Sequence, residues 1–176
     1  MVHYRRARTP GACYFLTLTL QDRSSDMLVR HHHELGEALR LACRQKPCRL
    51  PAIVLLPDHL HLLMTLPKDD ADFSSRIRLF KSTFVAALRA LPDNTVRLNG
   101  KGEANLWQRR FWEHLIRDER DFAAHVDYIH INPLTHGLVE RVRDWPHSSF
   151  HRHVQRGVLP VDWAGGAEEA VIRAGE

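Results

Sequence analysis

The strongest constraint on the fold of this chain is an apolar stretch, residues 55–64, that carries two histidines one residue apart. Successive side chains of a strand point to opposite faces, so His59 and His61 should project from one face and Leu60 and Leu62 from the other. Two imidazoles on a rigid strand can form half of a metal site, and imidazole suits Mn²⁺, Zn²⁺ and similar ions. So short a pattern also occurs on solvated strands, and it needs support from the rest of the chain.

The sequence around this stretch predicts a sheet with helices on one face. Apolar periodicity gives strands at residues 14–20, 50–56, 59–66 and 107–116, and helices at residues 31–45 and 72–91. This order is the split βαβ pattern of a ferredoxin-like α+β sandwich with an antiparallel sheet. The first and third strands are central in that topology. The histidine strand would therefore lie in the middle of the sheet, with its histidines on the open face if its leucines face the helices.

A further helix is predicted after the last strand. Asp118 should cap its start, and Pro133 should end or kink it. Tyr128 and Asn132 are four residues apart and share a helix face. If this helix crosses the open face of the sheet, Asn132 could supply an amide oxygen as a third metal ligand, and Tyr128 could act as a nucleophile beside a Lewis acid. The alternative for Tyr128 is simple packing with its hydroxyl hydrogen-bonded.

Length and composition favour an ordinary globular protein. The 176 residues suffice for one domain, which we place at residues 1–165, and residues 166–176 would form a C-terminal tail that need not be ordered. No apolar run approaches the roughly 20 residues of a membrane span, and no signal segment is evident, so a cytoplasmic location is expected. The three cysteines include no Cys-x-x-Cys pair, which argues against a disulfide framework or a thiolate zinc site.

The charge of the chain points to a polyanionic partner. The formal net charge is +4 with all thirteen histidines counted as neutral. The basic residues also cluster in separate segments of the chain rather than being evenly spread. Such clusters favour nucleic acid, because binding a phosphate backbone releases its condensed counterions.

Four motifs together resemble the single-tyrosine transposases whose active-site strand carries histidine, a hydrophobic residue and histidine (the HUH motif). Residues 57–63 (Pro-Asp-His-Leu-His-Leu-Leu) are similar to that strand. Residues 128–133 (Tyr-Ile-His-Ile-Asn-Pro), followed by Gly-Leu-Val at 137–139, are similar to the nucleophile helix. Two further segments resemble the branch of this family called REP-associated tyrosine transposases. They are residues 107–114 (Trp-Gln-Arg-Arg-Phe-Trp-Glu-His) and 144–150 (Asp-Trp-Pro-His-Ser-Ser-Phe).

The resemblance extends over nearly the whole chain, and it implies a metal-dependent endonuclease and strand transferase. Such an enzyme acts on single-stranded DNA with hairpins, at the repetitive extragenic palindromes (REPs) of bacterial genomes. It implies Tyr128 as the nucleophile that forms a covalent 5′-phosphotyrosine intermediate, His59 and His61 as metal ligands, and Asn132 as the amide ligand. The ion would be Mg²⁺ or Mn²⁺. The protein would be a monomer rather than a dimer, associated with the bacterial nucleoid in the cytoplasm.

Two positions depart from the family pattern and concern DNA contact rather than chemistry. His147 stands where the family usually has tyrosine, and Thr135 stands where lysine is common. In this fold several cations could border the face where the histidines emerge, and together they would form a basic groove for the DNA backbone. The predicted DNA-binding residues are Arg5, Arg6, Arg8, Lys81, Arg109 and Arg110.

Other functions remain open on the sequence. A domesticated protein could hold palindromic DNA as an organiser or regulator with little turnover, but pure binding requires neither Tyr128 nor a histidine pair. A hydrolase of small phosphoesters would not need so many basic clusters. A purely structural metal site is also disfavoured, because two histidines and an asparagine leave the coordination of an ion open.

Overall fold

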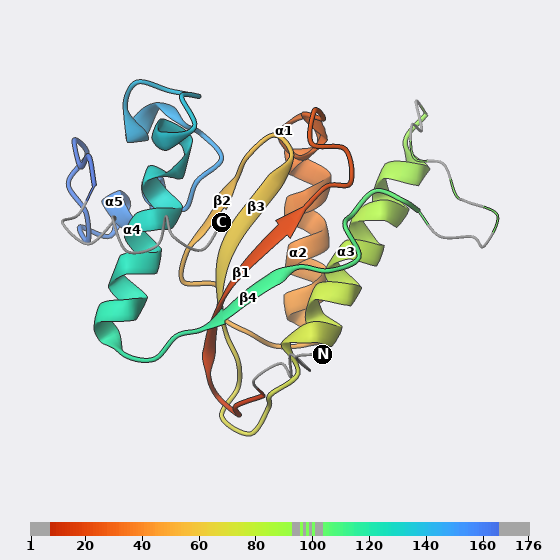
Figure 1. Ribbon diagram of the computed structural model, residues 1–176, viewed down its shortest axis with the longest axis horizontal. Helices are drawn as coiled ribbons and strands as arrows, with labels where there is room; N and C mark the ends of the chain where they lie inside the picture. The colour runs from red at the N-terminus through yellow and green to blue at the C-terminus, as the bar shows by residue number, and fades with distance from the viewer. Residues whose placement is uncertain (1–7, 93–95, 97, 99, 101–103, 166–176) are drawn as a thin grey trace, which may run out of the picture.

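A four-stranded antiparallel sheet with the strand order β2-β3-β1-β4 organises the protein (Figure 1). The computed structural model describes residues 8–92, 96, 98, 100 and 104–165. The central strands are β1 and β3, so the predicted α+β sandwich with an antiparallel sheet is confirmed. The elements are β1 (Cys13–Thr19), α1 (Met27–Arg30), α2 (His32–Gln45), β2 (Ile53–Leu55), β3 (His59–Thr65), α3 (Phe73–Ala90), β4 (Trp112–Leu115), α4 (Glu119–Thr135), the 3₁₀ helix η1 (Val142–Asp144) and α5 (Phe150–Gln155).

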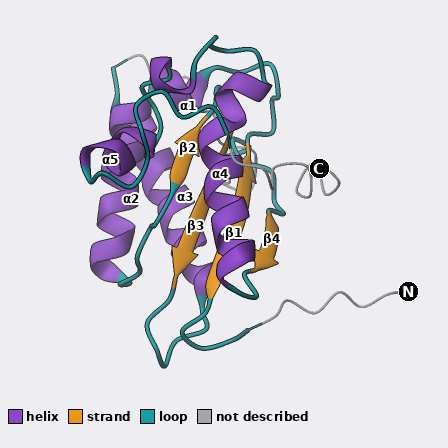
Figure 2. Cartoon of the chain, turned by 90° about the vertical axis from the view of Figure 1, so that its left-hand side faces the viewer, coloured by secondary structure: helices purple, strands orange, loops and turns teal. Residues whose placement is uncertain are grey.

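Helices α2 and α3 cover one face of the sheet, and α4 lies on the other side (Figure 2). Leu60 and Leu62 of β3 belong to the same buried core as Phe80 and Phe84 of α3. Helix α3 begins where the side chain of Asp72 caps its first turn, as the sequence predicts. Leu60 and Leu62 thus face α2 and α3. This leaves the histidines of the same strand on the opposite face, which is the face that α4 covers.

The contact between α4 and the sheet is apolar. Phe15 of β1 and Leu63 of β3 point to this side and form a second buried cluster with Tyr128 and Ile129 of α4. Burying such side chains stabilises the fold by about 1.5–3 kcal/mol each. The helix is therefore held against the face from which the histidines project, and its position relative to them is fixed by packing.

The structure corrects the bounds of two predicted strands. Strand β2 covers Ile53–Leu55 rather than 50–56, because Pro51 cannot donate to a ladder and its carbonyl instead accepts a hydrogen bond from Arg152. Strand β4 covers Trp112–Leu115 rather than 107–116. Trp107 forms only an isolated bridge to Leu20, just after β1, and packs in the core between the sheet and helices α2 and α3.

The helices also differ from the prediction in three places. A short helix, α1, precedes α2 and was not among the predicted helices. Helix α4 continues through Pro133 to Thr135, since a proline near the end of a helix removes only one hydrogen bond of its last turn. Helix α5 was not predicted at all.

No helix within the described ranges is long and apolar enough to cross a membrane. The predicted tail at 166–176 and the predicted DNA contacts Arg5 and Arg6 lie outside the described residues.

Candidate metal and nucleophile site

The two histidines of β3 project from the same face of the sheet. The register pairs Thr17 of β1 with His61 and Thr19 with His59, so these four side chains form two adjacent rows on one face. The ring centroids of His59 and His61 are 4.9 Å apart, and both side chains are buried. The alternation of side chains along β3 thus places two imidazoles next to each other on the face of the sheet that α4 covers.

Each imidazole is oriented by a hydrogen bond at its Nδ1 atom. Nδ1 of His61 lies 2.8 Å from the hydroxyl of Thr17, and Nδ1 of His59 lies 2.8 Å from the carboxylate of Asp58. Asp58 is also paired with Arg23, which holds the carboxylate in place. A hydrogen bond at Nδ1 leaves Nε2 of each ring as the nitrogen that could bind a metal ion, and such partners fix the tautomer of metal-ligating histidines in general.

The surroundings favour neutral imidazole at both positions. Burial lowers the pKa of His59 below its usual range, although Asp58 acts in the opposite direction. Burial also lowers the pKa of His61 well below its usual range, and the charges of His59, His136 and Arg23 add to this effect. A neutral ring keeps the lone pair that a metal ion needs, so the fold holds these side chains in their ligating form.

Helix α4 places the predicted nucleophile against the histidines. The carboxylate of Asp118 accepts a hydrogen bond of 2.8 Å from the backbone N–H of Asp121, which fixes the start of the helix as the sequence predicts. Three turns along, the ring of Tyr128 lies 5.3 Å from that of His61 and 5.8 Å from that of Phe15, centroid to centroid. The aromatic contacts hold the tyrosine beside the histidine pair.

Asn132 is buried on the same face of α4, one turn after Tyr128. Its side-chain oxygen Oδ1 has no hydrogen-bond partner among the residues the structure describes. A buried carbonyl oxygen left without a partner costs about 1–3 kcal/mol, so this atom is well suited to a cation. The donor set of two imidazole nitrogens and one amide oxygen therefore fits a divalent ion, with positions left for water and phosphate oxygens.

His136 is the site residue that sequence reasoning missed. It caps the C-terminus of α4 four residues after Asn132, and its ring centroid lies 5.4 Å from that of His59. The spacing of four from Asn132 was a usable signal. The helix was predicted to end or kink at Pro133, and no site residue was predicted beyond that position.

A second cluster of polar residues ties β4 to the start of α4. The carboxylate of Asp121 lies 2.9 Å from Nε2 of His114, and Nδ1 of His125 lies 2.7 Å from the backbone carbonyl of Asp121. Although burial acts to raise it, hydrogen bonds from His114 and Arg117 hold the pKa of Asp121 at about 2. Donor atoms of His114, Asp121 and His125 lie within 4.8 Å of one another, as in a metal site. We interpret the cluster as a structural network, since the carboxylate already accepts two bonds from Arg117.

The predicted DNA-binding residues are not all placed beside the histidines. Arg8, Arg109 and Arg110 are exposed. Lys81 lies on α3, which covers the face of the sheet opposite the histidines. Its ammonium donates to the carbonyl of Gln108 at 3.1 Å and lies over the rings of Trp107 and Phe111. Its position indicates a structural role. Trp112 of β4 is 44% exposed and lies opposite Thr17, which in turn lies opposite His61, so it shares the histidine face.

Comparison with known proteins identifies the family. The family described as "Transposase IS200 like" matches residues 12–132, a span that includes both histidines, Tyr128 and Asn132. The chain belongs to the IS200-like transposases.

Relatives of this transposase cover nearly its whole length. It is 43% identical over 176 residues to the REP-associated tyrosine transposase of Escherichia coli K12. The aligned region covers 100% of this chain and 98% of the relative. A Haemophilus influenzae homologue is 45% identical over 172 residues, 96% of each chain. Among solved structures, a REP-associated tyrosine transposase bound to a REP hairpin superposes with a TM-score of 0.83 at 44% identity, covering 94% of this chain and 93% of that one. The family resemblance inferred from the four motifs is confirmed, and the protein is a transposase enzyme.

In this transposase the motif at residues 144–150 builds the edge of the sheet. The backbone N–H of Leu55 donates to the carbonyl of His147 at 2.9 Å, and the backbone N–H of Ser149 donates to the carbonyl of Ile53 at 2.8 Å. The indole N–H of Trp145 also donates to the carbonyl of Leu55, at 2.9 Å. These bonds satisfy the outer side of β2 and protect an otherwise open strand edge.

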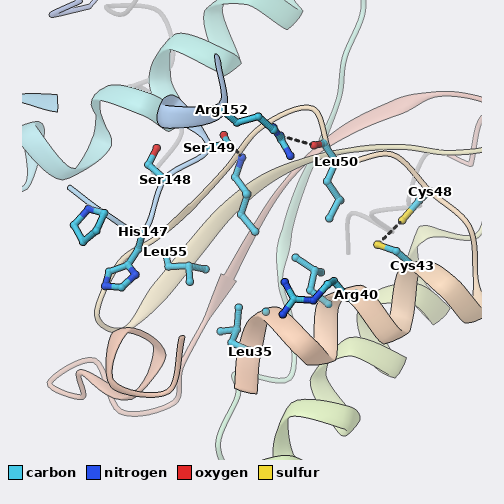
Figure 3. Close-up of a pocket in the computed structure, with 14 residues that line it drawn as sticks. Leu35, Arg40, Cys43, Cys48, Leu50, Leu55, His147, Ser148, Ser149 and Arg152 are labelled. Atoms are coloured by element: carbon cyan, nitrogen blue, oxygen red, sulfur yellow. Dashed lines mark hydrogen bonds between the residues drawn. The ribbon is translucent and has the colours of Figure 1, made fainter. Parts of the chain in front are cut away.

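A pocket of about 500 Å³ lies beyond this edge, between α2, β2 and residues 146–152 (Figure 3). Leu35, Arg40 and Arg152 are among its lining residues, and the thiols of Cys43 and Cys48 lie 3.4 Å apart at one end. The residues that line it include neither Tyr128 nor a histidine of β3, so the pocket is separate from the candidate site.

Proposed function

We propose that this transposase cuts and rejoins single-stranded DNA at REP-type hairpins through a covalent intermediate on Tyr128. The phenol of Tyr128 gives up its proton to solvent as its oxygen attacks the scissile phosphorus and forms a phosphotyrosine bond to the 5′ side of the downstream strand. The bond from phosphorus to the 3′ oxygen breaks, and the 3′ oxygen leaves as a hydroxyl after taking up a proton. The observation that carries this proposal is the contact between Tyr128 on α4 and His61 on β3, with Asn132 one turn further along the same helix face.

The residues that would hold a divalent ion, Mg²⁺ or Mn²⁺, are His59, His61 and Asn132. The two imidazoles would bind through Nε2 and the amide through Oδ1, which is buried without a partner within the described part of the chain. A bound divalent ion would polarise the scissile phosphate and stabilise the charge that develops in the transition state. Asp58 and Thr17 keep the rings oriented, and the apolar contact of Phe15 with Tyr128 limits the motion of the nucleophile.

The DNA partner we propose is a hairpin with unpaired flanking nucleotides. Support comes from the solved relative, which is described as bound to a REP hairpin. Arg8, Arg109 and Arg110 are exposed and could contact the backbone, while the proposed roles of Arg5 and Arg6 concern residues outside the described ranges. The exposed indole of Trp112 lies two strands from His61, about 10 Å away, and we expect it to stack on an unpaired base.

A cleavage assay with a histidine variant tests this function. The protein is incubated with a hairpin oligonucleotide from its own genomic flank and with increasing Mn²⁺ or Mg²⁺. We expect cleavage that requires the ion and that is lost in His59→Ala, while hairpin affinity stays within threefold of wild type. If wild type binds the hairpin tightly but leaves it intact at every ion concentration, the protein is the palindrome-binding organiser or regulator instead.

A further inference from the structure

The C-terminal end of α4 presents a third imidazole to the candidate metal site. Tyr128, Asn132 and His136 are spaced by four residues, so they follow one face of the helix. The backbone N–H of His136 donates to the carbonyl of Asn132 at 3.0 Å, which shows that the helical path continues to this residue. Tyr128 therefore contacts His61 at one end of this row, and His136 contacts His59 at the other.

The distances between the rings suit a shared ion. A ligating nitrogen lies about 2.1 Å from the metal and about 1.2 Å from its own ring centre, so two cis imidazoles have centroids about 4.6–5.4 Å apart. The centroids of His59 and His61 are 4.9 Å apart, and those of His59 and His136 are 5.4 Å apart. Both separations fall in the range expected for two imidazoles that bind one ion.

The side chain of His136 is available for this role. It is exposed, and its ring nitrogens make no hydrogen bond to any residue in the described ranges. The fold gives this ring no structural partner of the kind that Thr17 and Asp58 give the other two.

We propose that His136 is a third imidazole ligand of the ion held by His59, His61 and Asn132. This proposal rests on the function proposed above and makes the cofactor more specific. Three nitrogen donors favour a first-row transition-metal ion such as Mn²⁺ over Mg²⁺, which prefers oxygen ligands and retains its waters. The loop after α4 would then be anchored to the metal site, and it leads into the segment that pairs with β2.

The test is metal binding by the purified protein without DNA, so that it does not depend on activity. After removal of bound metal with a chelator, the affinities for Mn²⁺ and Mg²⁺ are measured by isothermal titration calorimetry, and Co²⁺ is added to record the visible absorption of its ligand field. The variants are His136→Ala, His59→Ala and, as a matched control that removes an exposed histidine from α2, His33→Ala. Circular dichroism verifies that each variant is folded.

We expect one Mn²⁺ per wild-type chain, bound more tightly than Mg²⁺, and no specific binding in His59→Ala. The change His136→Ala should weaken Mn²⁺ at least tenfold and alter the Co²⁺ spectrum, while Mg²⁺ affinity changes by less than threefold. His33→Ala should match wild type. If His136→Ala keeps wild-type Mn²⁺ affinity and the wild-type Co²⁺ spectrum while His59→Ala loses both, the third ligand is refuted and the proposed metal site stands. If His59→Ala binds Mn²⁺ as well as wild type does, the proposed metal site itself is refuted.

Discussion

Lowering the pH should destabilise this protein through a buried histidine of α4. His130 is fully buried, and its Nε2 atom lies 3.0 Å from the hydroxyl of Ser149. That hydroxyl also accepts the backbone N–H of Ile53 at 2.9 Å. Burial, with the nearby charges of His153 and Arg152, lowers the pKa of His130 to about 3.

The magnitude follows from the two pKa values. In the unfolded chain a histidine takes up a proton near its ordinary pKa of about 6.5, whereas His130 in the folded protein does not until about pH 3. Stability that is present above pH 6.5 is therefore lost as the pH falls, by about 1.4 kcal/mol per pH unit. Between pH 7.5 and pH 5.0 this one residue should cost about 2 kcal/mol of unfolding free energy.

Urea denaturation at both pH values measures the effect, with His130→Gln as the comparison. The substitution itself changes the free energy of unfolding at pH 7.5. Subtracting the values of each protein at the two pH values removes this contribution. We expect the acid-induced loss to be about 2 kcal/mol smaller in the variant than in wild type. The other buried histidines are present in both proteins and contribute equally. Equal losses in the two proteins would refute the reasoning.

Three further changes test other parts of the structure. Asp121→Asn should lower the free energy of unfolding, measured by thermal melts, by about 1–3 kcal/mol, because hydrogen bonds from His114 and Arg117 lose their charged acceptor. The control Glu119→Gln changes an exposed residue in the same turn and should have little effect. Trp112→Ala should weaken binding of a hairpin with a single-stranded flank about tenfold by fluorescence anisotropy, yet leave a hairpin without the flank within twofold. Arg110→Ala should reduce the slope of log affinity against log salt concentration by about one unit for every hairpin sequence. An unchanged slope would show that Arg110 does not contact the DNA backbone.

The central part of the fold was predictable because it depends on short-range patterns. Alternation along residues 59–65 determines which side of β3 carries histidine, and the helix spacing of Tyr128 and Asn132 places both on one face. Asp118 and Asp72 are local capping signals, and both cap helices in the structure. These features need no knowledge of distant contacts.

The parts that were missed depend on contacts distant in sequence. The bounds of β4 were wrong because Trp107 packs against Phe80 and Phe84 of α3 rather than continuing the strand. The edge pairing of residues 147–149 requires β2 as a template, so no local pattern reveals it. His136 was missed because the helix was predicted to end or kink at Pro133, whereas α4 continues through Pro133 to Thr135.

The most direct test of the account is the identity of the residue that becomes attached to DNA. The sequence has three tyrosines, and one of them, Tyr14, is buried in the helix-side core, where its hydroxyl accepts a backbone hydrogen bond from Thr9. Protein incubated with a hairpin oligonucleotide and Mn²⁺ is digested, and the peptide–nucleotide adduct is located by tandem mass spectrometry. We predict a 5′-phosphate ester on Tyr128, absent in Tyr128→Phe and retained in Tyr14→Phe. Cleavage by Tyr128→Phe at the wild-type rate, or an adduct on any other residue, would contradict the account.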